Sequence, residues 1–184
     1  MASLRDIRKR IKSVQNTAKI TNAMKMVAAA KLRRAQEAVE AARPYAQKMA
    51  HLLSDISARA ERAGEPPHPL LEQRDPSKVE LVVMTSDRGL CGGFNSNINR
   101  RAERFMWEER EKHHEIRLST IGQKGTDHFR RKRADLRHAY TGVFDDLSYT
   151  AAATIAKELA DYYVREELDA IYLLYNEFKS AISQ

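Results

Sequence analysis

The stretch that decides the fold lies near the N-terminus, where residues 4–63 read LRDIRKRIKSVQNTAKITNAMKMVAAAKLRRAQEAVEAARPYAQKMAHLLSDISARAERA. Two interleaved series with a spacing of seven residues run through it. The first is Leu4, Ile11, Ala18, Lys25, Leu32, Val39, Ala46, Leu53 and Ala60, and the second is Ile7, Val14, Thr21, Ala28, Ala35, Ala42, Met49, Ile56 and Ala63. Only Thr21 and Lys25 are polar, so the pattern predicts a coiled-coil helix with one apolar seam.

A helix of this length would measure roughly 90 Å at 1.5 Å per residue, which exceeds the diameter of a domain of this size. Much of it must project, and the rest of the chain is too short to cover its seam. Alanine dominates the seam, so a neighbouring helix can approach closely while each layer buries little apolar area. Pro44 should bend this helix or end its first half.

The charge of the chain is concentrated on the same segment. The whole sequence carries a formal net charge of +7, and residues 1–50 hold 12 basic and three acidic residues. This imbalance indicates an acidic partner, which could be nucleic acid, an anionic membrane or an acidic protein surface. No run of about 18 apolar residues occurs, so we expect no direct membrane insertion. A single cysteine, Cys91, excludes an internal disulfide and a zinc site built from cysteines.

The pattern changes after AGEPPHP (63–69), because glycine and three prolines cannot continue a helix. We therefore divide the chain into a long helix at 1–63, a linker at 64–78 and a domain at 79–184. In that domain β-branched runs predict strands at 79–86, 115–122 and 168–176, and helical patterns lie at about 95–112, 123–132 and 148–166. Strands that alternate with helices predict an α/β fold with a small, Rossmann-like parallel sheet.

The densest motif is SDRGLCGGFN (86–95), which leaves the first predicted strand and enters a helix. Phosphate-binding turns occupy that position in many α/β proteins, but neither G-x-G-x-x-G nor a Walker sequence is present. We therefore interpret the motif as a structural or contact turn, and its cysteine as a small packed thiol rather than a nucleophile. The residues of this turn are Ser86, Asp87, Arg88, Gly89, Cys91, Gly92 and Gly93.

No other group of residues predicts chemistry. His113 and His114 are adjacent, so they would point in different directions on a helix, and we expect both on the solvated surface. Asp145 and Asp146 precede a helix, and their charge at a helix entry explains them more simply than acid/base catalysis. We expect no catalytic residue, no metal site and no cofactor.

Lys25 is a charged residue at a seam position. It lies in TNAMKMVAAAK (21–31), where Met24 and Met26 add apolar surface beside it. Such a lysine can fix the register of a coiled coil, or extend its ammonium into water, or contact an acidic partner. The sequence leaves these three interpretations open.

Four segments resemble the γ subunit of F-type ATP synthases. They are IRKRIKSVQNTAKITNAMKMVAAAKLRRAQ (7–36), ARPYA (42–46), SDRGLCGGFN (86–95) and YNEFKSAISQ (175–184). The resemblance implies a non-catalytic rotor that couples rotation of a proton-driven membrane ring to ATP synthesis. Its N-terminal helix would pair with a C-terminal helix as a shaft inside the ring of α and β subunits. The α/β domain would bind the ε subunit and help to contact the c-ring.

The resemblance also implies where the protein resides and which residues contact partners. A bacterial γ subunit is peripheral on the cytoplasmic face of the cell membrane, held there through the complex. Members of this family continue for about 100 residues beyond Gln184, an ordinary domain's length, and that segment supplies the second shaft helix. The implied shaft and partner contacts are Leu4, Ile7, Ile11, Val14, Lys19, Met24, Lys25, Met26, Lys31, Arg33 and Arg34.

Two alternatives belong to other functional classes. A basic region that runs into heptads is also typical of a coiled-coil protein that binds nucleic acid. Here, however, the heptads run through the basic region, and a dimer seam rich in alanine would be weak. A small nucleotide-binding enzyme is the other alternative, and it rests only on the glycine turn. The family resemblance favours a rotor that binds no nucleic acid.

Overall fold

The computed structural model of the chain describes residues 3–64, 68–145 and 147–177. The chain divides into two compact units, Met1–Pro66 and Pro67–Gln184. The elements in chain order are α1 (Leu4–Ala63), the 3-10 helix η1 (Pro69–Leu71), β1 (Lys78–Met84), α2 (Phe94–Glu109), β2 (Glu115–Ile121), α3 (Gln123–Arg131), β3 (Leu136–Tyr140), α4 (Tyr149–Val164) and β4 (Ala170–Leu174).

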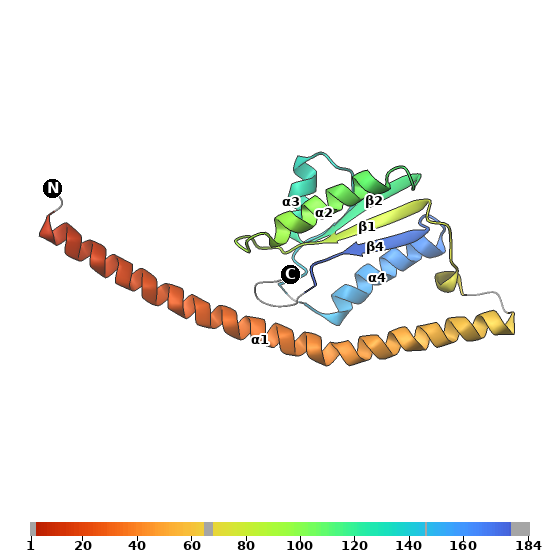
Figure 1. Cartoon of the computed structure of the whole chain (residues 1–184), viewed down its shortest axis with the longest axis horizontal. Coiled ribbons are helices and arrows are strands. Elements are labelled where there is room, and N and C mark those ends of the chain that lie inside the picture. Colours follow the sequence, from red (N-terminus) through yellow and green to blue (C-terminus); the bar gives the residue numbers. More distant parts are fainter. Residues whose placement is uncertain (1–2, 65–67, 146, 178–184) are drawn as a thin grey trace. The chain divides into compact units, whose positions relative to one another are not determined.

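The first unit is the single helix α1, which has a defined beginning and end. At its start the Ser3 hydroxyl accepts a hydrogen bond from the Asp6 amide, and the Asp6 carboxylate accepts one from the Ser3 amide. At its end Gly64 adopts φ 67°, a left-handed conformation that suits glycine. Pro44 lies inside α1 and does not end it, and Figure 1 shows one continuous, curved helix. On this exposed surface, water can hydrate the carbonyl that loses its amide partner.

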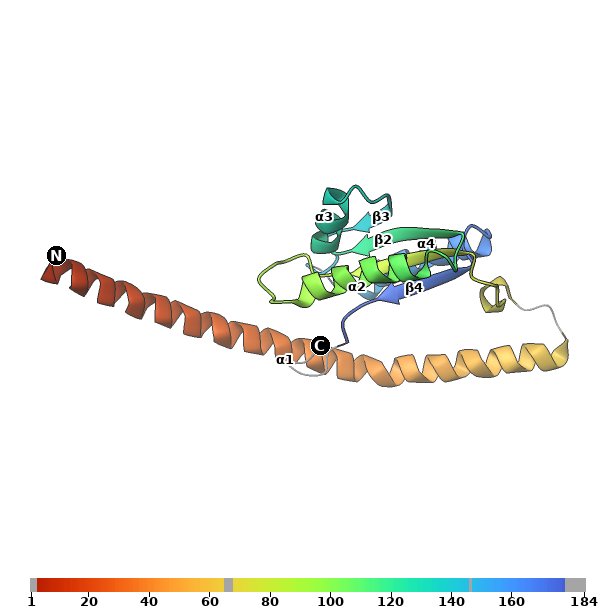
Figure 2. The same ribbon diagram turned by 45° about the horizontal axis from the view of Figure 1, so that its top comes forward.

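The second unit contains a four-stranded parallel sheet with the strand order β3-β2-β1-β4. The three strands expected from β-branched runs are confirmed as β1, β2 and β4. The shape is Rossmann-like: Figures 1 and 2 show α2 and α3 on one face of the sheet and α4 on the other. The predicted α/β class, with a long N-terminal helix and a small parallel sheet, is therefore confirmed. Among the described residues, no helix is long and apolar enough to cross a membrane.

An apolar core fills the space between the sheet and the two helices α2 and α3. Its buried members are Leu81, Val83, Ile98, Ala102, Leu118 and Phe129. Side chains alternate between the two faces of a strand, so Leu81 and Val83 point into this core while Glu80 and Val82 point toward α4. The two faces of one sheet therefore differ in chemistry.

Two expectations for this unit need correction. The short strand β3, LRHAY, was not predicted, because its arginine and histidine hide the apolar alternation that marks a half-buried strand. His113 was expected on the solvated surface together with His114, but it is buried. Its Nδ1 lies against the carbonyl oxygen of Pro76, and this partner from a distant segment explains why an imidazole can be buried there.

The end of β1 and the start of α3 approach each other closely around Gly122. This glycine has φ 104°, and a Cβ on it would overlap the main-chain carbonyl of Thr85. The Thr85 hydroxyl accepts a hydrogen bond from the Gly125 amide at 2.8 Å. Residues 122–127, GQKGTD, therefore contain the turn from β2 into α3, and a hydrogen bond attaches the start of α3 to the end of β1.

We expect Gly122→Ala to be strongly destabilising and Gly142→Ala to serve as its matched control. Gly142 also has a positive φ, 74°, but an added Cβ would meet nothing within 4 Å. The control should lower the free energy of unfolding by about 1–2 kcal/mol, the cost of a left-handed alanine. Gly122→Ala should cost at least about 2 kcal/mol more, because the main chain must also move. Equal urea midpoints for the two variants would contradict the close approach.

Candidate functional site

The proposed contact residues fall into two sets, one in each unit. The first set lies on α1, which has no buried residue. Leu4 is 77% exposed and Val14 is 64% exposed, although both are apolar seam positions. Helical periodicity places Leu4, Ile7, Ile11 and Val14 along one stripe of the helix. The structure therefore presents a long apolar stripe with its seam open.

The charged members of this set are also solvent exposed. They are Lys19, Lys25, Lys31, Arg33 and Arg34. Of these, Arg33 pairs with Glu37 one turn along the helix, at 2.9 Å between Nε and Oε1. Exposed pairs of this kind contribute little to stability, so the basic side chains are free to rearrange toward a partner. Met24 and Met26 are exposed beside them.

The second set lies in the turn between β1 and α2, referred to here as the glycine turn (residues 86–93). Asn95 holds it together: its Oδ1 accepts from the Ser86 amide at 3.0 Å, and its Nδ2 donates to the Arg88 carbonyl at 3.2 Å. Gly92 has φ 59° in open space, and a Cβ on Gly93 would lie 2.9 Å from Nδ2 of Asn97. Asn95 stood in the quoted motif, but we did not predict that it supports the turn.

The tip of the glycine turn faces solvent. Leu90 has φ 59°, which is unusual for a residue with a side chain, and its side chain is fully exposed. Cys91 was expected to be a packed thiol, but it is exposed, with its Sγ 3.1 Å from Nδ2 of Asn95. The conformation of the turn therefore directs both side chains outward, which leaves no core for the thiol to pack into.

Asp87 ties the glycine turn to two neighbouring loops. Its Oδ1 accepts from the amides of Gln123 (2.8 Å) and Gly142 (3.1 Å), and its Oδ2 accepts from the amide of Phe144 (3.3 Å). Partial burial acts to raise the pKa of this carboxyl, but the three amide hydrogen bonds outweigh burial, and the pKa lies below its usual value. The loops after β1, β2 and β3 are thereby fixed to one another at the carboxyl ends of these strands.

Next to Asp87, an exposed ion pair crosses the same edge. Arg88 Nη2 lies 3.1 Å from Asp145 Oδ1, and both side chains are largely exposed. These residues line a shallow depression together with Asp87, Gln123, Thr141 and Gly142. Asp145 lies three residues before Ser148, the N-cap of α4, whose hydroxyl accepts from the Ala151 amide at 3.2 Å. Asp146 lies outside the described residues.

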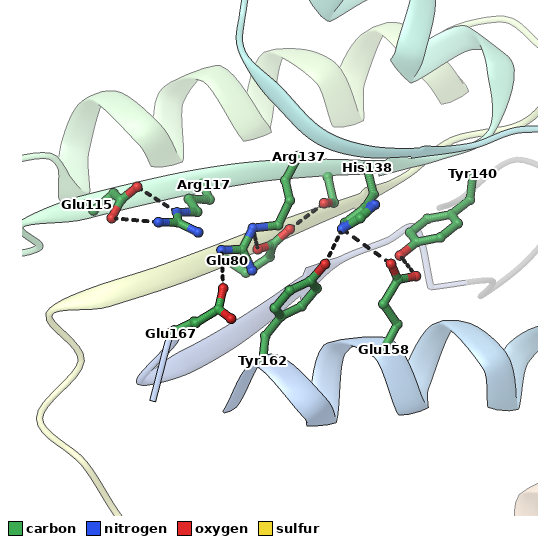
Figure 3. A network of polar contacts seen from close by, with 10 residues as sticks. Glu80, Glu115, Arg117, Arg137, His138, Tyr140, Glu158, Tyr162 and Glu167 are labelled. Atoms are coloured by element: carbon green, nitrogen blue, oxygen red, sulfur yellow. Dashed lines mark hydrogen bonds and ion pairs between the residues drawn. The ribbon is translucent and has the colours of Figure 1, made fainter. Parts of the chain in front are cut away.

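A second polar feature lies between the sheet and α4 (Figure 3), and sequence reasoning did not predict it. Glu80, in the middle of the buried strand β1, is fully buried and accepts a hydrogen bond from the Ser119 hydroxyl. Arg137 Nε lies 3.5 Å from Glu80 Oε2. Burial raises the pKa of Glu80, although the Ser119 hydrogen bond opposes the rise. The sequence did offer one signal for this network, because Glu80 is a charged residue inside the otherwise apolar segment VELVVM (79–84).

The same network reaches α4 through aromatic and acidic side chains. His138 Nε2 lies 3.0 Å from the Tyr162 hydroxyl and 3.4 Å from Glu158 Oε1. The Tyr140 hydroxyl donates to Glu158 Oε2 at 2.6 Å, and burial together with this bond raises the pKa of Tyr140. The network therefore joins β1 and β3 to α4 through polar side chains.

We predict that Asp87→Ala lowers the free energy of unfolding by about 1–3 kcal/mol at neutral pH, because three amides lose a charged acceptor. The folded pKa of Asp87 is depressed, so its stabilisation is present above the unfolded pKa and is lost as the pH falls through the folded pKa. The difference between wild type and variant should therefore shrink in acid. Asp145→Ala, which removes only an exposed pair, should cost less than about 1 kcal/mol. Urea titrations from pH 3 to 7 would measure both, and a pH-independent difference for Asp87→Ala would contradict this role.

Comparisons with known proteins agree with this architecture. A family model described as ATP synthase matches residues 3–184. The ATP synthase gamma chain of Anaeromyxobacter sp. (strain Fw109-5) is 53% identical over 184 residues, which are 100% of this chain and 63% of that protein. The gamma chain of Geobacter metallireducens is 50% identical with the same coverage. The chain thus spans less than two thirds of the length of these curated relatives.

Solved structures show the same fold. The Tetrahymena thermophila mitochondrial ATP synthase structure, described as central stalk and c-ring, contains a chain with TM-score 0.69 and 30% identity, over 89% of this chain and 68% of that one. A chain in the rotor of the Euglena gracilis mitochondrial ATP synthase has TM-score 0.53 and 16% identity, over 98% of this chain and 59% of that one, which is a likeness of fold alone. The match to the family model and the similarity to these relatives show that the chain belongs to the ATP synthase family, among the gamma chains.

Proposed function

We propose that this chain acts as a central-stalk rotor subunit in a proton-driven F-type ATP synthase, and that it carries no active site of its own. The observation that supports this proposal best is the open apolar stripe on α1. A helix of 60 residues that buries none of them requires a partner along its length. In a gamma chain that partner is a second helix, which would complete the shaft inside the α and β subunits.

A shaft can drive a reaction without catalytic residues. If α1 touches each β subunit differently, rotation changes which nucleotide-binding conformation each subunit favours, and the coupling lies in differential contact free energy. The alanine and methionine side chains near residues 24–30 would give α1 a smooth apolar surface that can slide against the surrounding subunits. The exposed basic side chains of α1 would follow acidic loops through ion pairs that are individually weak and so can break on every turn.

The α/β unit would provide the remaining contacts. We assign the glycine turn to a contact with the α and β subunits, because Asp87 and Asn95 hold its base while Leu90 is presented to solvent. Other surfaces of the unit would bind the ε subunit and contribute to contact with the c-ring. Through these partners the protein would be peripheral on the cytoplasmic face of the bacterial cell membrane.

The shaft proposal predicts different effects for two charge substitutions two residues apart. Val14→Asp places a carboxylate in the seam, whereas Asn16→Asp places the same charge on the opposite side of the helix. When the chain is mixed with the C-terminal segment of a related gamma chain, Val14→Asp should raise the Kd at least about tenfold. Asn16→Asp should leave the Kd near the wild-type value. Fluorescence anisotropy of the labelled segment would measure both, and equal affinities would contradict the seam.

The contact role of the glycine turn is tested by Leu90→Ala. The Leu90 side chain is fully exposed, so its removal should change the free energy of unfolding by less than about 0.5 kcal/mol. Assembly with α and β subunits should nevertheless weaken, because an apolar contact is lost. Leu70→Ala, at a half-exposed leucine outside the turn, is the control and should assemble normally. Normal assembly of Leu90→Ala in a quantitative pull-down would remove the turn from the interface.

A further inference from the structure

The helix α4 is attached to the sheet differently from the other two helices. Helix α2 buries Ile98, Asn99 and Ala102, and α3 buries Gly125, Thr126 and Phe129. All residues of α4 are described, and none of them is buried. Figure 3 shows two polar side chains of α4, Glu158 and Tyr162, directed toward the sheet, and both are half-buried, as are the apolar Ile155 and Leu159. Apolar burial is therefore smaller in α4 than in α2 and α3, and polar contacts add to the attachment of α4.

A β-bulge in β3 makes this polar attachment possible. Leu118 of β2 pairs with Leu136, and the next residue, Ser119, pairs with His138, so Arg137 is an extra residue. A bulge breaks the alternation of side chains, and two consecutive residues can then serve one face. Figure 3 shows Arg137 and His138 both directed toward α4. The sheet thus presents a guanidinium and an imidazole side by side to the same helix.

Arg137 is the centre of these contacts. We refer to Arg137 and its three partners, Glu80, Tyr162 and Glu167, as the α4 latch. The Arg137 guanidinium lies 3.5 Å from Glu80, 3.6 Å from Glu167 and 4.1 Å above the ring of Tyr162. Its Nη1 and Glu80 Oε2 are buried without a hydrogen-bond partner among the described residues. Such long, incompletely satisfied contacts hold the helix less firmly than an apolar core does.

The far end of α4 is joined to the segment that precedes β1. Arg74 Nη1 donates to the Tyr163 carbonyl at 2.7 Å, at the C-terminal end of α4, and its guanidinium stacks 4.6 Å from the Tyr163 ring. The Tyr163 hydroxyl in turn donates to the Glu72 carbonyl at 2.5 Å. Residues 69–75 are therefore fastened to α4 by reciprocal hydrogen bonds. This segment is also where the chain arrives from α1.

We propose that α4 and residues 69–75 form one cooperative unit, held on the sheet by the α4 latch, that opens from the sheet while β1–β3, α2 and α3 remain folded. The opening unit contains the point where the α/β domain receives the chain from α1. Sub-global opening of this kind is expected where apolar burial is smallest. The domain then has a compliant connection to α1 in place of a rigid one.

Hydrogen exchange of the full chain, followed by mass spectrometry, tests this proposal. Arg137→Met keeps the length of the side chain and removes its charge. Amides of residues 69–75 and of α4 should exchange about tenfold faster together, while those of α2 and α3 keep wild-type rates. Arg117→Met is the matched control, because Arg117 lies on the neighbouring strand and its ion-pair partner is the more exposed Glu115, at 2.6 Å. The control should leave the exchange of α4 unchanged.

A second variant guards against general unfolding. Arg137→Met leaves Glu80 as a buried carboxylate without its cation, which could destabilise the whole sheet. The double variant Glu80→Gln/Arg137→Met removes that charge and should retain wild-type protection in α2 and α3, with fast exchange confined to α4 and residues 69–75. If α4 keeps wild-type protection in the double variant, or if all helices lose protection equally, the proposal is wrong. Separate exchange of α4 and residues 69–75 would also overturn it.

Discussion

The proposed function depends first on a helix that cannot cover its own apolar surface. Helix α1 carries an apolar stripe over 60 residues, and none of its residues is buried. Water penalises exposed apolar surface in proportion to its area, and a stripe that repeats every seven residues can be covered along its whole length only by another helix. Its alanine-rich composition sets the character of that contact, which is close, smooth and weak in each layer. Those properties suit a shaft better than a permanent clamp.

The α/β unit differs from α1 because it has an apolar core of its own. It is small, however, and must still hold its loops in fixed positions. It concentrates its apolar core on one face, around Leu81 and Phe129, and uses polar groups elsewhere. At one edge Asp87 fixes three loops through main-chain amides, so that the glycine turn has a firm base and an exposed tip. On the face toward α4, Arg137 bridges the sheet and the helix. The loops that Asp87 fixes are thus the rigid part of this small domain, and α4 is the part that can open from the sheet.

The sequence predicted the parts of the fold that follow from periodicity. The heptads predicted α1, and β-branched runs predicted three of the four strands. The strand β3 was missed because a bulge directs Arg137 and His138 to the same face, which destroys the alternation on which strand prediction relies. Burial of Glu80 and His113 could not be predicted either, since each depends on a partner that lies far away in the sequence. Propensity also could not decide between a bend and an end at Pro44, because tertiary surroundings and hydration determine which occurs.

The central claim is that the apolar stripe on α1 is a coiled-coil face that pairs with a second helix. The most direct test combines circular dichroism with analytical ultracentrifugation of the chain, alone and with the C-terminal segment of a related gamma chain. The account predicts that the chain alone self-associates or loses helix content, and that the added segment converts it to a defined one-to-one complex with more helix. A chain that is already a monomer with full helix content, and that the segment leaves unchanged in both signals, would contradict the account.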